Sequence, residues 1–195
     1  MATDTAPTKP TDATEEKLRD ALTEIETQLA NARSQVADEQ TALDGIIEQV
    51  ASTPGDKRVK AAEKAAVAQS TLHVLTAAVD CLDARRHAAH VALLEHEVER
   101  LSDEVAAKKA AALKLRDELL DARRTIHRGG LDQHDPSDDN ARLKLGSRVG
   151  KLETALQIAN REHNQAARMR EAALADLAEV DAGAADAWRR SRRGR

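Results

Sequence analysis

Apolar residues recur along this chain in steps of four and three residues, with charged residues between them. A row with this spacing lies along one side of an α-helix and packs against a second helix, as in coiled coils. We call such a row a seam. The first seam has one polar member, Glu39, and predicts a helix over about residues 12–52. Its members are Leu18, Leu22, Ile25, Leu29, Ala32, Val36, Glu39, Leu43, Ile46 and Val50.

A second predicted helix follows Pro54-Gly55, a turn signal that also ends the first helix. Neither Gly nor Pro occurs from Asp56 to Arg128, so we expect one continuous helix over residues 56–128. A connection this short makes the second helix antiparallel to the first. The early seam of the second helix comprises Ala61, Ala65, Ala68, Leu72, Leu75, Val79 and Leu82. Its later seam comprises Val91, Leu94, Val98, Leu101, Val105, Lys108, Ala112, Leu115, Leu119, Ala122 and Ile126.

These two seams are out of phase, because the heptad frame jumps between Asp83 and His90. A jump of frame rotates the apolar row around the helix, so the side that seeks a neighbour changes there. We therefore expect the second helix to exchange one neighbour for another. The alternative is an ordinary stutter with no change of neighbour.

A third helix is expected over about residues 138–190, after Gly129-Gly130 and a polar loop. Two polar members, His163 and Arg170, make its seam the weakest of the three. The seam comprises Leu145, Val149, Leu152, Leu156, Ala159, His163, Ala166, Arg170, Ala173, Leu177 and Val180.

Helix lengths suggest how the three helices fit together. At 1.5 Å per residue they measure about 60, 110 and 80 Å, so the first and third together exceed the second by about 30 Å. We predict an all-α, elongated antiparallel coiled coil of three long helices, in which two hairpins overlap in a short central three-helix segment over about residues 75–95. Residues 1–11 are expected to be a disordered arm, and residues 191–195 a basic tail.

Composition supports thin helical seams. Charged residues make up 33% of the chain, and Trp188 is the only aromatic residue, so a thick globular core lacks its usual large side chains. The sustained apolar period argues against disorder. The single cysteine, Cys81, fits a reducing compartment, and no secretory h-region or membrane-length apolar run is apparent, so we expect a cytoplasmic protein or one incorporated into a larger assembly.

Candidate chemistry is sparse. We find no catalytic, phosphate-binding or zinc-protease motif, so we expect no enzyme activity, cofactor or small-molecule substrate. Asp83, His87 and His90 have a spacing that metal ligands can use, but a second helix would have to supply further ligands. Solvated histidines on a charged helix are the better interpretation, and we expect no metal site.

The C-terminal segment is the most informative part of the sequence. Trp and Arg are enriched in binding hot spots, and here the only aromatic residue precedes a cluster of arginines. The expected partner-binding residues are Trp188, Arg189, Arg190, Arg192, Arg193 and Arg195. The alternative is that Trp188 packs at the end of the helix while the arginines offset its dipole.

Leu113, Leu120 and Ile158 fall outside the seams. A two-helix hairpin would leave them in water, so we expect them to form an oligomer interface, although scattered exposed leucines need no explanation. The predicted function is that of a structural, assembly or adaptor protein that acts through coiled-coil contacts with proteins and forms a homo-oligomer. In outline its architecture is similar to viral assembly scaffolds, with no motif behind the similarity. The alternative is nucleic-acid binding through the basic tail; a third, membrane sculpting, conflicts with the acidic N-terminal part, and we expect no membrane partner.

Overall fold

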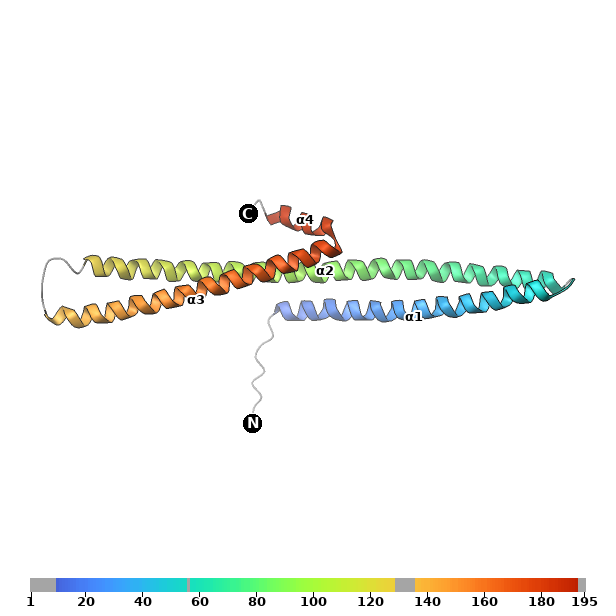
Figure 1. Ribbon diagram of the computed structural model, residues 1–195, viewed down its shortest axis with the longest axis horizontal. Coiled ribbons are helices and arrows are strands. Elements are labelled where there is room, and N and C mark those ends of the chain that lie inside the picture. The colour runs from blue at the N-terminus through green and yellow to red at the C-terminus, as the bar shows by residue number, and fades with distance from the viewer. Residues whose placement is uncertain (1–9, 56, 129–135, 193–195) are drawn as a thin grey trace, which may run out of the picture. The chain divides into compact units, whose positions relative to one another are not determined.

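The computed structural model describes residues 10–55, 57–128 and 136–192, which form four α-helices and no strand (Figure 1). Helix α1 spans Pro10–Ser52, α2 spans Lys57–Arg128, α3 spans Pro136–Val180 and α4 spans Ala182–Arg192. The described helices belong to two compact units that divide between Leu93 and Leu94. The all-α fold is confirmed, and the helices pack as hairpins. The expected elongated shape and central three-helix segment concern how the two units adjoin, and they stay predictions.

The first unit is a hairpin of α1 and the first part of α2. All ten expected seam positions of α1 are buried or half-buried, and Leu29 is 3% exposed. The seven early seam positions of α2 are likewise buried or half-buried. Gly55 has φ of 66° and its carbonyl accepts a hydrogen bond from the Arg58 amide at 3.0 Å, which starts α2. A left-handed turn residue of this kind favours glycine.

The second unit pairs the rest of α2 with α3. Val98 and Leu177 are 0% exposed, and the other expected seam positions from Leu145 to Val180 are buried or half-buried. Ile126, the last expected seam member of α2, is 39% exposed, because fewer side chains surround the end of the helix. Arg33 of α1 forms an ion pair with Asp83 of α2, with 2.8 Å between Nη2 and Oδ2, and Lys108 of α2 forms one with Glu162 of α3. Helix α2 therefore contacts α1 before the frame jump and α3 after it.

A break at Asp181 corrects the prediction of a single helix over residues 138–190. The Asp181 amide donates to the Leu177 carbonyl at 2.7 Å, while its carboxylate accepts the Ala184 amide at 2.9 Å. Asp181 thus ends α3 and caps the N-terminus of α4, as aspartate commonly does. Helix α4 turns back and packs against α3 (Figure 1). Leu174, outside the expected seam, is 3% exposed in this part of α3.

The observed bounds differ from the expected ones at three further places. Helices α1 and α3 each begin two residues early, at Pro10 and Pro136, because proline suits the first position of a helix. Helix α4 extends to Arg192 and takes in the first two residues of the expected tail. Residues 1–9 of the expected arm, the loop over 129–135 and residues 193–195 lie outside the described residues.

One polar seam member, Lys108, pairs its charged group with a carboxylate of the neighbouring helix. Lys108, the interruption in the α2 seam, reaches out to Glu162 of α3, with 2.7 Å between Nζ and Oε2. The hydrogen bond from Lys108 to Glu162 and the charge of Glu162 raise the Lys108 pKa above its ordinary value of 10.5. A charged residue is therefore tolerated at this seam position, because its aliphatic stem packs while its ammonium group finds a carboxylate.

The Lys108–Glu162 pair contributes to the stability of the fold in a pH-dependent way. The raised pKa means that its stabilisation is fully present below pH 10.5 and is lost as the pH rises through the folded-state pKa. We expect Glu162→Gln to bring the Lys108 pKa back toward 10.5 and to lower the melting temperature at pH 8 but not well above the raised pKa. Side-chain NMR titration and thermal unfolding at both pH values measure this. If the variant still melts at a lower temperature than the unmodified protein at high pH, the ion pair with Lys108 is not the cause of the difference.

Candidate protein-interaction surfaces

Helix α4 carries most of the sequence-predicted binding residues. Its inner side contains Ala185, which is 0% exposed, followed by half-buried Trp188 and Arg192. The spacing of three and four residues places these side chains on one side of the helix. This side holds α4 against the rest of the second unit.

Trp188 and Arg192 act together. The Arg192 guanidinium lies 5.8 Å from the centroid of the Trp188 ring, and it also forms an ion pair with Glu99 of α2. A cation this close to an indole face is attracted by the ring. The Trp188 Nε1 is buried and has no hydrogen-bond partner among the described residues. The structure therefore gives Trp188 and Arg192 an internal packing role.

Arg189 and Arg190 lie outside the inner side of α4. Both are exposed, and Arg189 pairs with Asp186 of the preceding turn, with 3.2 Å between its Nη1 and Asp186 Oδ1. Arg193 and Arg195 lie outside the described residues. The four predicted residues that the structure describes are thus split between an inner pair and an outer pair, and we call Arg189 and Arg190 the outer arginines of α4.

The three predicted oligomer-interface residues are all exposed: Leu113 by 47%, Leu120 by 38% and Ile158 by 50%. Two ion pairs between α2 and α3, Arg123–Glu153 and Lys108–Glu162, show on which side of the hairpin each of these residues lies. Glu153 and Glu162 are nine residues apart on α3, which is about half a turn around the helix, so the two pairs mark opposite sides of the hairpin.

Leu113 and Leu120 share the side of α2 that carries Arg123, three residues after Leu120. Ile158 shares the side of α3 that carries Glu162, four residues further on. The structure therefore does not bring the three residues into one patch. A partner that covers Leu113 and Leu120 leaves Ile158 in water.

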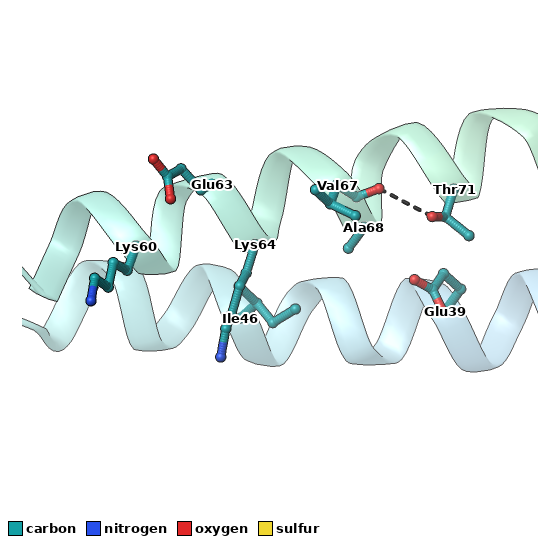
Figure 2. Close-up of a pocket in the computed structure, with 8 residues that line it drawn as sticks. All are labelled: Glu39, Ile46, Lys60, Glu63, Lys64, Val67, Ala68 and Thr71. Carbon is teal, nitrogen blue, oxygen red and sulfur yellow. Dashed lines mark hydrogen bonds between the residues drawn. The ribbon is translucent and has the colours of Figure 1, made fainter.

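A groove in the first unit was not foreseen from the sequence. It runs between α1 and α2 with a volume of about 530 Å³, and Figure 2 shows the side chains along it. Lys60 and Lys64 lie toward one end, Glu39 lies toward the other, and Val67 and Ala68 lie between them. The signal for it was the run of alanines in the early α2 seam, because small side chains leave space beside them. The lining comprises Glu39, Ile46, Lys60, Glu63, Lys64, Val67, Ala68 and Thr71.

The histidines do not assemble a metal centre in the described part of the chain. No three His, Cys, Asp or Glu side chains there come together as ligands. Asp83 is held by Arg33 and Arg86, while His87 and His90 line a shallow hollow with Glu26.

Part of the α2 sequence is long and apolar enough to meet the criterion for a membrane span, which we did not expect. Within residues 57–126, an 18-residue window has a mean hydropathy of 1.3, enough in length and composition for a membrane span, and 6% of the window is buried. No Asp, Glu, Lys or Arg occurs from Ala65 to Val79. The same stretch supplies five seam residues that pack against α1, so its apolar character already serves the hairpin.

Comparisons with protein-family models, with curated proteins and with solved structures found no match for this chain.

The attachment of α4 has a direct optical readout, because Trp188 is the only aromatic residue of the chain. Asp181→Ala removes the α4 cap, at a cost of about 1 kcal/mol. We expect the tryptophan emission to shift to longer wavelength and acrylamide quenching to increase, while the helical circular dichroism changes little. Asp186→Ala, an exposed carboxylate on the same helix, is the control. Emission and quenching identical to the unmodified protein would show that the cap does not hold α4.

Proposed function

We propose that this chain is a structural or assembly protein that acts as an adaptor through coiled-coil contacts with other proteins. The observation that carries the proposal is the construction of α4. Trp188 and Arg192 hold the helix against the rest of the second unit, and the outer arginines Arg189 and Arg190 are exposed to solvent. A helix positioned in this way offers cations at fixed places, which suits recognition of a partner surface.

An acidic protein surface is the partner that fits α4. Arginine forms planar, bidentate pairs with carboxylates, and Arg190 has no ion pair within the described residues. Nucleic acid is the alternative. It is favoured less, because binding to single strands uses aromatic stacking and the only aromatic ring here is half-buried under Arg192.

The proposed setting is the cytoplasm or an assembly made there. Cys81 is exposed and is the only cysteine, which suits a reducing compartment. We also propose self-association, because the described helices expose Leu113 and Leu120 one heptad apart on one side of α2.

Reversing the outer arginines tests the docking role. We expect Arg189→Glu with Arg190→Glu to remove a defined set of proteins from affinity capture in the source cells, since it replaces attraction to carboxylates with repulsion. Lys144→Glu with Lys151→Glu makes the same charge change on exposed residues of α3 and is the control. An identical set captured by all three proteins overturns the docking role. A low-salt mobility shift of DNA or RNA that only the arginine variant loses assigns α4 to nucleic acid instead.

A second experiment tests self-association on α2. We expect Leu113→Lys with Leu120→Lys to lower the mass measured by light scattering, because two lysines cannot be desolvated in an apolar interface. Ile47→Lys with Val59→Lys is the matched control in the first unit, where these residues are 51% and 61% exposed. An unchanged mass for the leucine variant shows that this side of α2 is not an interface.

A further inference from the structure

We propose that the groove between α1 and α2 is a second self-association site. The same groove of another copy of this chain would occupy it, with the two copies antiparallel. The inference goes beyond the proposed function, because it involves neither α4 nor Leu113 and Leu120. It depends on the order of charges along the groove, on the exposed apolar side chains beside it and on a glycine of α1 that adjoins a groove residue in sequence.

The charges are arranged for self-pairing. Along α2 the order is Lys60, Glu63, Lys64 and then Val67 and Ala68, while Glu39 of α1 lies near the level of Thr71 (Figure 2). With two lysines and one glutamate, the first end of the groove carries a net positive charge, while the middle is apolar and the other end is acidic. A two-fold axis through the level of Val67 and Ala68 brings Lys64 of each copy to Glu39 of the other. Opposite charges meet twice, as a closed symmetric dimer requires.

These charges have no competing partners. Neither Lys60, Lys64 nor Glu39 forms an ion pair within the described chain, whereas Arg33, Lys108 and Arg123 do. Glu39 is half-buried and lines the groove at the end opposite Lys60. A lysine from a second copy would supply a cation to pair with it.

Exposed apolar groups provide the contact area. Val67 and Val74 are 68% and 64% exposed and lie one heptad apart in the charge-free stretch from Ala65 to Val79. Valines in water at helical spacing on the same helix gain by burial against a second helix. Charged groups at both ends of the groove limit such a contact to one register.

Gly45 of α1 is next to Ile46, which lines the groove. A methyl group added at Gly45 would meet nothing within 4 Å, so packing within the chain does not require glycine there. Glycine inside a helix destabilises it by roughly 0.5–1 kcal/mol relative to alanine. A backbone without a side chain lets another helix approach closely. Glycine at this position is therefore consistent with a second copy packed beside α1.

Variants with reversed charges test whether two copies pair through the groove. In the full chain, Lys64→Glu and Glu39→Lys should each weaken the dimer by about tenfold or more, because each variant places like charges together at both contacts. Light scattering should show each variant at half the mass of the unmodified protein. An equimolar mixture of the two variants should recover the dimer, since the glutamate introduced at position 64 of one chain then meets the lysine introduced at position 39 of the other. Circular dichroism checks that each variant stays helical.

Cysteine substitution fixes the register. In a Cys81→Ser background, Val67→Cys lies beside the two-fold axis and should join two chains when treated with a short bifunctional thiol reagent. Val74→Cys is the matched control, with similar exposure on the same side of α2. Its two copies would lie about 20 Å apart along the helix axis and should not be joined.

Three outcomes overturn the proposal. They are a protein whose mass is unaffected by both charge variants, a mixture of the variants that stays at half mass, and cross-linking that is as efficient at residue 74 as at residue 67. The results for α4 and for Leu113 and Leu120 do not enter these outcomes, so failure here and failure of the proposed function are distinguishable.

Discussion

Burial of small aliphatic side chains along narrow seams is the interaction on which this structure depends. A chain with one aromatic residue has no large side chains with which to fill a thick core. Its apolar surface is instead buried one heptad at a time between two helices, and few of the described residues reach zero exposure. Each unit is therefore stabilised along its whole length, and no single central cluster dominates.

The same constraint creates the surfaces available for binding. A seam two side chains wide covers only one side of each helix, so apolar residues elsewhere on the helix stay in water. Val67, Val74, Leu113 and Leu120 are examples. The helices of the first unit also leave a groove beside the seam, with the seam residue Ala68 in its lining. In a protein of this kind, the features that limit the core are the ones that expose contact surfaces.

Much of the fold could be predicted from the sequence, because the heptad period is long and regular. All ten α1 seam positions, including Glu39, are shielded as expected, and the frame jump coincides with the change of neighbour from α1 to α3. The break at Asp181 was missed, although Asp181 followed by Gly183 is a recognisable cap. The uninterrupted period before it favoured a single helix.

The candidate sites were less predictable. The Arg-rich segment was identified from composition, but its division into an inner and an outer side depends on how α4 packs, which composition does not contain. The groove depends on the register between α1 and α2, since it takes Glu39 from one helix and Lys64 from the other. Leu113 and Ile158 were grouped because both fall outside the seams, and their opposite positions emerge only from the cross-helix ion pairs.

The length of α4 has a consequence for how the chain can search for a partner. A helix of 11 residues is too short to persist by itself in water, so α4 exists as a helix because it is packed. Once detached from Glu99 and α3, it would become an extended strand of polypeptide reaching up to about 37 Å from Asp181. Detachment would thus exchange a fixed array of cations for a long-range tether, with a larger capture radius and a higher entropic cost of binding.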